Sequence, residues 1–574
     1  MSGLNTILGN AALLQSVGGL PNLITNMAPT PEGLKVIDTL ESAVSRSGLK
    51  KDIVSEFRGA VGALRALHQN GGTPKAFWTR REEVVLQLGR FNGAIDSKLL
   101  TLARWGQQSK NPVDGISSIL ANIDASALFY LDQLDSLVAT PSISDGKHLP
   151  NEAVIHASEQ VLRMLEPAYF DVIKVLRTTR SNPSVFAWRK IDPKKPTVLF
   201  YAHFDVQPTG EGWRTDPFKL HIEEGRAFAR GSADDKAGIV SVLGALEAYF
   251  RHRKDCHCNT AVFFEGEEEI QSPNLPALLA QLPKNFKPDV VVLTDTDNVM
   301  SGVPTITMTT RGLAAVRLEV ETLGKEVHSG IHGGVVLDAN LALAKILAAL
   351  VDDNGDPLIE GLDTRETHLP SAIRKSLPQI PFDPQAYRKA VGMRAKAPFL
   401  GPPDAGNYER RWGRYVLDVI AQRGGDVDNP RGVIIPKASA IITLRVPPGQ
   451  DSRTAYRLLL RQIKKIAPRG ARVRLTSTLP PIQPWAGATA HPAVKKLQQA
   501  MTRGYGRQSV LGGSGGSIGF LDEFQRRFPG VPLLPIGVED PFTNAHAANE
   551  SLNIPDFVST IRSLALFLDL MSRP

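Results

Sequence analysis

The chain has 574 residues, of which 42% are hydrophobic and 22% are charged, and its formal net charge is +8. These values are typical of globular proteins and exclude a chain that is disordered throughout. No run of about 18 apolar residues indicates a membrane span, and two cysteines cannot form a disulfide framework. The basic residues form no aromatic-and-basic motif, so we expect neither nucleic acid nor a membrane as a partner. No secretory signal is recognisable, which makes the cytoplasm the expected location.

Residues 1–125 are predicted to form an all-α N-terminal extension. Apolar residues recur at helical spacing in 34–44 and 54–67, and a Gly-Gly-Thr-Pro turn at 71–74 separates these helices from others around 84–102. This extension carries no group of metal-binding or nucleophilic side chains. A packing or oligomerisation role is therefore the favoured interpretation.

From residue 126 the pattern predicts an α/β catalytic domain. Strand-like runs at 197–201, 261–264 and 290–293 alternate with helical patterns such as 238–250. Continuous apolar strands separated by helices indicate a mostly parallel mixed sheet that is flanked by helices and buried on both faces.

Within 311–480 the pattern predicts an inserted α+β domain of two layers. Its strands and helices are expected, in chain order, at 314–321, 338–351, 440–446, 452–466 and 471–477. The α/β domain, which begins with 126–310, is expected to resume over 481–574 with a helix at 493–504 and a strand at 533–538.

Five short polar signals lie at or just after predicted strand ends, where open α/β sheets place their sites. The first is His203 with Asp205. Residues two apart in an extended segment point to the same side, so His203 can bind a metal while Asp205 supports its imidazole. An ordinary polar pair is the alternative.

The next two signals are rich in carboxylates. Asp234 and Asp235 lie between a strand and a helix; Asp234 could bridge two cations, whereas Asp235 also suits a helix N-cap. Four glutamates within 265–269 directly follow a hydrophobic strand and repel one another unless cations or protons intervene. An acidic surface turn is the alternative for this run.

The last two signals are Asp295, with Asp297, and His546, each of which follows a predicted strand. Two histidines and several carboxylates are a donor set that suits zinc or manganese. Two histidines and three carboxylates would fill two sites that share one bridging ligand, with ions about 3.5–4 Å apart.

Taken together, the motifs resemble those of a known family. Four of them follow one another along the chain: His203-Phe-Asp205-Val-Gln-Pro, Arg230-Gly-Ser-Ala-Asp234-Asp235-Lys, Glu265-Gly-Glu-Glu268-Glu269 and Val327-His328-Ser329-Gly330. This combination resembles the M20 metallopeptidases, and within them most closely the branch of the carnosinases and cytosolic non-specific dipeptidases. The resemblance covers about residues 125–574 and leaves out the N-terminal extension.

The resemblance implies a site with two divalent metal ions per subunit, zinc or alternatively manganese. Asp234 would bridge the two ions. His203 and Asp295 would complete one site, and Glu269 and His546 would complete the other.

The same resemblance implies catalytic roles. Glu268 would be the general base that takes a proton from a metal-activated water, and Asp205 would orient His203. His328 would enter the active site of a partner subunit and stabilise the oxyanion. This implies a homodimer formed through the inserted domain, which would also act as a lid, and the extension at 1–125 could build a higher oligomer.

Substrate contacts follow from the resemblance as well. Arg445 matches the arginine that binds the free carboxylate of the substrate, and Gly515, Gly516 and Ser517 resemble the loop that lines the substrate pocket. The implied activity is hydrolysis of the amide bond of dipeptides or related small peptides.

Several alternatives stay open. An N-acyl amino acid amidohydrolase would use the same mechanism, because its substrates also present an amide and a carboxylate. A non-catalytic assembly protein could keep the metal site, although it would not need the intact Glu268. The sequence departs from the family at Ile270-Gln271-Ser272, where a small turn is usual, and in the Pro-rich stretch 357–405, which we expect in the lid. Matches to G-x-S-x-G at 512–516 and 515–519 are attributed to a Gly-rich run rather than to a serine hydrolase.

Overall fold

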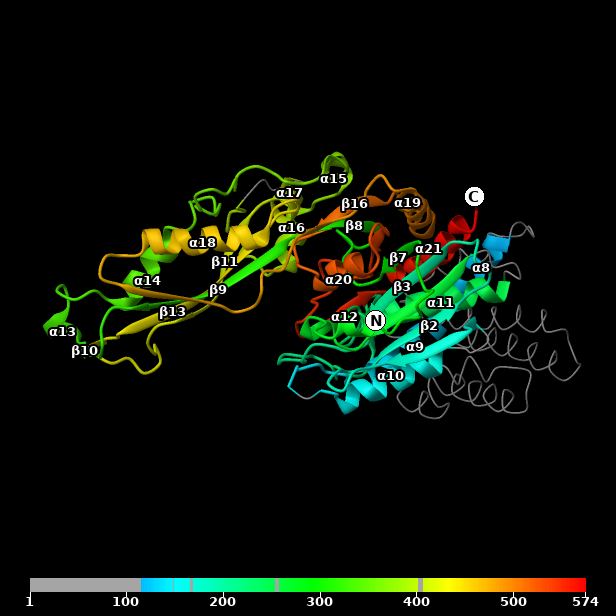
Figure 1. Ribbon diagram of the computed structural model, residues 1–574, viewed down its shortest axis with the longest axis horizontal. Coiled ribbons are helices and arrows are strands. Elements are labelled where there is room, and N and C mark those ends of the chain that lie inside the picture. Colours follow the sequence, from blue (N-terminus) through cyan, green and yellow to red (C-terminus); the bar gives the residue numbers. More distant parts are fainter. Residues whose placement is uncertain (1–114, 148, 166–168, 253–257, 401–405, 574) are drawn as a thin grey trace, which may run out of the picture. The chain divides into compact units, whose positions relative to one another are not determined.

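A computed structural model describes residues 115–147, 149–165, 169–252, 258–400 and 406–573 (Figure 1). The described residues form two compact units. The first comprises residues up to Glu269, Gln499–Arg507 and residues from Val538 onward, and the second comprises Ile270–Gln498 and Gln508–Gly537. Most of the predicted N-terminal extension, 1–114, lies outside the described residues, so that prediction remains untested.

The first unit contains a mixed sheet. Strands β1 (Val172–Leu176), β2 (Ser184–Arg189), β6 (Asn259–Glu265) and β3 (Thr197–His203) are neighbours in this order. β3 and β6 are parallel, whereas β1 with β2 and β2 with β6 are antiparallel. The strands predicted at 197–201 and 261–264 are confirmed. The sheet of this unit is less parallel than predicted, because β1 and β2 are joined by a short connection that reverses the chain.

Helices surround this sheet. α11 (Lys236–His252) packs against β3 and against α8 (Gly115–Ala125), α9 (Ala127–Val138) and α21 (Ile554–Met571). A Cβ at Gly244 would lie 2.8 Å from the ring of Tyr130, so a glycine is needed where α11 meets α9. Every residue of β3 and β6 is buried, which explains their continuous apolar sequences. The remaining elements of this unit are α10 (Glu152–Met164), β4 (His221–Glu223), β5 (Arg226–Phe228) and β18 (Ser551–Asn553).

A four-stranded antiparallel sheet forms the core of the second unit. Its strand order is β11 (Val416–Arg423), β13 (Lys437–Val446), β9 (Gly312–Glu321) and β14 (Arg472–Ser477). Helices α14 (Ala339–Ala348) and α18 (Ser452–Ile466) pack against it, as Figure 1 shows. Their apolar side chains share one buried cluster with alternate residues of β9 and β13. The two-layer arrangement is as predicted, except that the edge strand β11 was not foreseen, because its apolar residues do not alternate.

The second unit also holds short strands and helices. Its short strands pair as β7 (Val290–Leu293) with β17 (Leu533–Pro535), β8 (Thr305–Thr310) with β15 (Trp485–Ala486) and β16 (Val510–Ser514), and β10 (Val327–His328) with β12 (Val433–Ile434). The remaining helices are η2 (Glu268–Ile270) and α19 (Pro492–Tyr505), which straddle the unit boundaries, and α12 (Leu275–Leu279), α13 (Ser329–His332), α15 (Ser371–Ser376), η3 (Leu377–Gln379), α16 (Pro384–Ala390), α17 (Gly406–Gly413) and α20 (Gly519–Arg527). Among the described helices, none has the length and apolar character that crossing a bilayer requires.

The two-layer core yields a stability prediction. Ile442 on β13 is fully buried, whereas Ile420 on β11 is 65% exposed. We expect Ile442→Ala to lower the free energy of unfolding by about 2–5 kcal/mol, because the lost side chain leaves a cavity. The matched Ile420→Ala should cost less than about 0.5 kcal/mol. Denaturant unfolding followed by circular dichroism measures both, and equal losses would contradict the assigned core.

Candidate metal centre

A buried aspartate, Asp234, lies at the centre of the site. It lies two residues before the start of α11, and its two carboxylate oxygens face different histidines. Oδ1 lies 3.1 Å from Nε2 of His203, and Oδ2 lies 2.9 Å from Nε2 of His546. Burial alone would raise the pKa of Asp234, but the hydrogen bonds with the two histidines outweigh it and hold this pKa well below its usual range. Asp234 is thus an anion with both oxygens in use.

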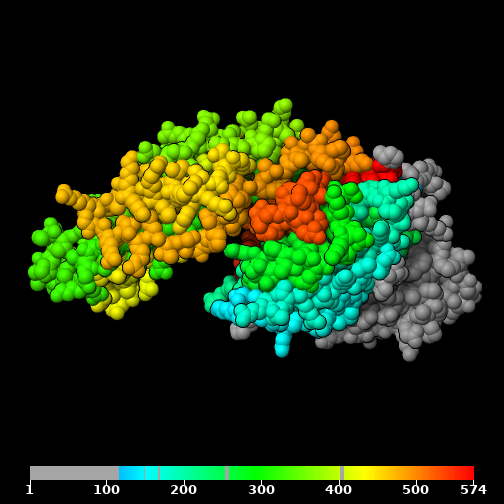
Figure 2. All heavy atoms as spheres, viewed as in Figure 1, coloured from blue at the N-terminus to red at the C-terminus, as the bar shows by residue number. Residues whose placement is uncertain are grey.

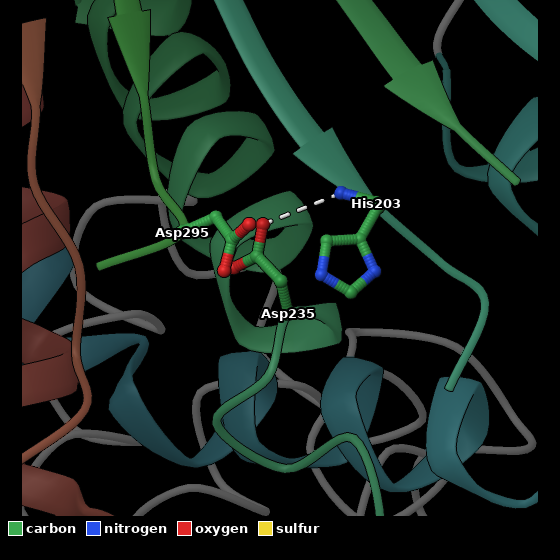
Figure 3. A group of neighbouring side chains, drawn as sticks. All are labelled: His203, Asp235 and Asp295. Carbon is green, nitrogen blue, oxygen red and sulfur yellow. Dashed lines mark hydrogen bonds between the residues drawn. The ribbon is translucent and has the colours of Figure 1, made fainter. Parts of the chain in front are cut away.

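His203 is the last residue of β3, and its ring is fixed by its neighbours. Nδ1 lies 3.0 Å from the backbone carbonyl oxygen of Asp205. A carbonyl oxygen only accepts hydrogen bonds, so Nδ1 carries a proton, and Nε2 contacts Asp234 through a second proton or through a metal ion. The backbone N–H of His203 donates to Oδ2 of Asp235 at 3.3 Å (Figure 3). Strand β3 and these two contacts together orient the ring.

The Asp205 side chain holds the glutamate segment rather than the histidine ring. Its Oδ1 and Oδ2 accept the backbone N–H groups of Glu268 and Glu269, each at 3.2 Å, while its Oδ1 is 3.6 Å from Nδ1 of His203. Glu268 keeps 21% of its side chain exposed, and its Oε2 lies 4.0 Å from Nε2 of His203. Glu268 therefore lies beside the site with an accessible carboxylate.

Glu269 points into the same centre as Asp234. Its Oε2 lies 3.3 Å from Nε2 of His546. Gln207 donates its backbone N–H to Oε1 at 3.1 Å and its side-chain amide to Oε2 at 2.9 Å. Burial, and then the negative charge of Asp234, raises the pKa of Glu269 to about 7. Two neighbouring carboxylates thus share one histidine, an arrangement that favours a positive charge between them.

The other two glutamates of the acidic run have structural partners. Glu265 accepts a hydrogen bond from the hydroxyl of Tyr201 at 2.8 Å. Glu267 accepts the backbone N–H of Asn182 at 2.7 Å. Both are buried. The run is therefore not an acidic surface turn.

His546 lies in a loop with a left-handed backbone, at φ +62°. Both ends of this loop are fixed by ion pairs. Arg226 binds Asp540 through two parallel hydrogen bonds of 2.7 and 3.0 Å, and Arg230 donates to Glu550 at 2.6 Å. Neither acid was predicted as a functional residue, and the only signal for them in the sequence is their closeness in the chain to His546.

Glu550 also holds the segment that carries Asp234. Its Oε2 accepts the N–H of Gly231 at 3.0 Å, and its Oε1 accepts the N–H groups of Ala233 and Asp234 at 3.0 and 3.1 Å. Glu550 and Arg230 are both fully buried or nearly so. One carboxylate therefore links the His546 loop to the Asp234 segment.

The residues of this centre fit a divalent cation. Asp234, Glu269 and His546 each offer a ligand atom, and these atoms lie within 4.8 Å of one another. On the other side of Asp234, the lone pair of His203 Nε2 faces a carboxylate oxygen, and the two would repel without a shared proton or cation. Imidazole nitrogen and carboxylate oxygen are the donors that zinc binds in catalytic sites.

The hydrogen bonds to His546 also indicate that the centre suits a cation. The contacts with Asp234 and Glu269 raise the pKa of His546 to about 11. The ring nitrogen therefore lies where a positive charge is strongly favoured, whether a proton or a metal ion supplies it.

Asp295 follows β7, as the sequence predicted, and Asp297 lies two residues further on. Both belong to the second unit, whereas the other predicted ligands belong to the first. The assignment of Asp295 as a metal ligand therefore remains a prediction.

The predicted substrate-binding residues gather in the second unit. Arg445, on β13, donates from Nη1 to the hydroxyl of Ser517 at 3.0 Å. Gly515 and Gly516 lie in the same loop, and their carbonyl oxygens accept the side-chain Nε and the backbone N–H of Arg311 at 2.9 and 3.1 Å. Arg311 was not among the predicted residues.

His328 lies elsewhere in the second unit, on the two-residue strand β10 that follows β9. Its side chain is exposed, and its Nδ1 accepts the backbone N–H of Gly330 at 3.1 Å. The lone pair of Nδ1 is thereby used, so the proton of a neutral ring is on Nε2, which can donate to a ligand.

Comparison with known proteins gives a consistent result. Residues 199–570 match the model of peptidase family M20/M25/M40. The chain is 30% identical over 411 residues to a cysteinylglycine-S-conjugate dipeptidase of Corynebacterium striatum, which covers 71% of this chain and 88% of that protein. It is 26% identical over 394 residues to the human β-Ala-His dipeptidase, covering 67% and 76% of the two chains. The crystal structure of human carnosine dipeptidase 1 has the same fold, with a TM-score of 0.69 at 22% identity over 80% of this chain and all of that one.

The buried Glu550–Arg230 pair yields a second prediction. Glu550→Gln leaves the guanidinium of Arg230 buried without a carboxylate, so we expect the free energy of unfolding to fall by about 3–5 kcal/mol. The affinity for added Zn²⁺ should fall about 10- to 100-fold, because the Asp234 segment loses its support. Thermal unfolding and a competitive zinc titration measure the two effects.

The matched control is Glu223→Gln. Glu223 pairs with Arg214 at 3.9 Å, with 45% and 65% of the two side chains exposed, and such surface pairs contribute little. If the Glu550 variant behaved like this control, the linking role of Glu550 would be wrong.

Proposed function

The chain belongs to peptidase family M20/M25/M40, and we propose that it is a two-metal dipeptidase that hydrolyses the amide bond of dipeptides with a free carboxylate. The family match over 199–570 confirms the resemblance read from the motifs. The relatives from C. striatum and human are dipeptidases by name. The observation that supports the proposal most directly is Asp234, whose two oxygens face two different histidines at 3.1 and 2.9 Å.

The proposed ligands follow from this geometry and from the order of the motifs. Asp234 would bridge two ions, Glu269 and His546 would complete one site, and His203 and Asp295 would complete the other. We propose zinc as the metal, with manganese as the alternative, because both accept nitrogen and carboxylate ligands. When bound, such ions polarise the scissile carbonyl and lower the pKa of water.

Glu268 is the proposed general base. Its backbone is held by Asp205 at 3.2 Å, and its partly exposed carboxylate can accept the proton of the attacking water. The same carboxylate then returns this proton to the nitrogen of the leaving amine, so no net proton stays on the enzyme. Proton transfer of this kind contributes about 10²–10⁴ in rate.

Recognition of the substrate is assigned to the second unit. Arg445 provides a planar guanidinium, which suits a carboxylate, and the loop of Gly515, Gly516 and Ser517 lies next to it through the hydrogen bond to Ser517. We assign to this unit the role of a lid. His328 is assigned to the stabilisation of the oxyanion by hydrogen bonding.

The length of β9 supports a homodimer. Arg445 pairs with Leu313 at the start of β9, while His328 lies beyond Glu321 at its end. Eight residues of extended strand span about 27 Å, whereas a dipeptide is about 7 Å long. This separation supports a homodimer in which His328 of a second copy reaches the dipeptide that Arg445 binds.

Exposed apolar residues lie near this histidine. Ile331 and Val335 are 70% and 88% exposed. The segment that carries them, with α13 and β10, lies at the surface at the left of Figure 2. We assign this end of the second unit to the dimer interface, and we retain residues 1–125 as a possible source of higher assembly.

Two finer points complete the proposal. An N-acyl amino acid amidohydrolase remains the alternative, because its substrates also present an amide and a carboxylate and because Ile270 stands where the family usually has a small turn. The cytoplasm remains the proposed location, which suits a chain with two cysteines.

Two adjacent glutamates provide a test of the mechanism. Glu268→Gln should lower kcat for Cys-Gly by about 10²–10⁴ while the metal content stays that of the parent, because the base is lost and the ligands remain. Glu269→Gln should lose both activity and bound metal. Elemental analysis with the rate of amine release measures both. A Glu268→Gln enzyme with undiminished kcat would contradict the assigned base.

Mixing inactive chains tests the assignment of His328. We expect Glu268→Gln and His328→Ala homodimers to be inactive. In a hybrid dimer, one active site combines the intact Glu268 of one chain with the intact His328 of the other. Random pairing makes half the dimers hybrids with one working site of two, so about a quarter of the parent activity should return.

The control for this mixture pairs Glu268→Gln with Glu269→Gln. Both changes lie in the first unit, so no hybrid site is complete and activity should stay absent. A His328 that acted within its own chain would leave the first mixture inactive as well.

A further inference from the structure

Two arginines come together in the second unit at the start of β9. Arg311 immediately precedes β9, and Arg445 on β13 pairs with Leu313. Residues two apart on a strand share a face, so Arg311 and Arg445 are diagonal neighbours on one face of the sheet. Only Arg445 has a proposed role so far.

Both arginines bind the same short loop, residues 514–517. Arg311 donates from Nε to the carbonyl of Gly515 at 2.9 Å, and Arg445 donates from Nη1 to the hydroxyl of Ser517 at 3.0 Å. The loop is also closed on itself, because the N–H of Gly516 donates to the hydroxyl of Ser514 at 3.1 Å. A Cβ at Gly515 would lie 3.1 Å from Nη2 of Arg311, so the guanidinium lies directly against the loop.

The guanidinium of Arg311 is not neutralised by this packing. The residue is only 9% exposed, and its Nη1 has no hydrogen-bond partner among the described residues. Burial, followed by the charges of Arg445 and Arg411, lowers the pKa of Arg311 to about 9. The negative charge of Asp418 favours the charged form of both Arg311 and Arg445, but Asp418 lies exposed to solvent on β11. A buried cation beside other cations is costly unless an anion binds to it.

We propose that Arg311 and Arg445 together bind the terminal carboxylate of the substrate, with Arg311 as a second specificity-determining residue. This rests on the proposed dipeptidase function. The planar guanidinium forks match the two oxygens of a carboxylate, and Nη1 of Arg311 supplies the donor that is left over. Arg311 also holds the 514–517 loop, so the loop and the carboxylate site form one structure.

The test compares a dipeptide acid with its amide. Arg311→Lys keeps a positive charge but removes the fork. We expect KM for Cys-Gly to rise about 10- to 100-fold, the equivalent of one or two charge-assisted hydrogen bonds, while KM for the carboxamide of Cys-Gly changes less than about threefold. Arg445→Lys should show the same difference. Arg317→Lys, on an exposed position of β9, should change neither value.

A misfolded fraction does not change the ratio of the two KM values. Inactive protein lowers the apparent kcat for both substrates alike and leaves each KM as it is. Equal changes for acid and amide in Arg311→Lys would overturn the carboxylate role and leave the dipeptidase proposal standing. Binding of a Cys-Gly analogue with a reduced peptide bond, as acid and as amide, gives the same comparison without turnover. An Arg311→Lys protein that still preferred the acid as strongly as the parent would refute the inference even if the parent did not cleave Cys-Gly.

Discussion

The candidate centre depends on one buried carboxylate that serves two histidines. Asp234 uses Oδ1 toward His203 and Oδ2 toward His546, and these residues come from three distant parts of the chain. A carboxylate in this position is stable as an anion only because positive charge is favoured on both sides. Because positive charge is favoured on both sides of Asp234, the site suits two cations.

A set of hydrogen bonds around Asp234 fixes its neighbours. Glu550 joins the Asp234 segment to the His546 loop, Gln207 fixes the carboxylate of Glu269, and Asp205 fixes the backbone beside Glu268. These groups contact the proposed ligands and the base. They set the positions within which a metal pair and a general base would act.

Much of the fold and of the candidate metal centre could be predicted from the sequence, and the features that could not be predicted have physical causes. Helix α18 was predicted with its observed bounds because apolar residues recur at helical spacing, and β3, β6 and β7 are apolar runs. The residue pattern alone does not sort the roles of the glutamates, which the family resemblance supplied, since Glu265 and Glu267 differ from Glu269 only in their partners, Tyr201, Asn182 and His546. Glu550 and Arg311 were missed because their importance comes from contacts with residues far away in the chain.

Two proposed roles lie apart along one strand of the second unit. Arg445 and Arg311 lie at the start of β9, together with the 514–517 loop, and His328 lies past its end. A strand of this length keeps the proposed carboxylate site and the proposed oxyanion contact apart within one chain. The proposal of a homodimer follows from this distance and does not need the N-terminal extension.

The most direct test of metal-dependent dipeptide hydrolysis is to measure the release of free amine from Cys-Gly and β-Ala-His and from their N-acetylated forms. Each rate is measured with enzyme loaded with zinc or manganese and with the same enzyme after chelation. We expect hydrolysis of the free dipeptides that is lost on chelation and restored by the metal. Preference for the acetylated substrates would move the specificity to the acylase side. Hydrolysis that persisted in the metal-free enzyme would contradict the two-metal account.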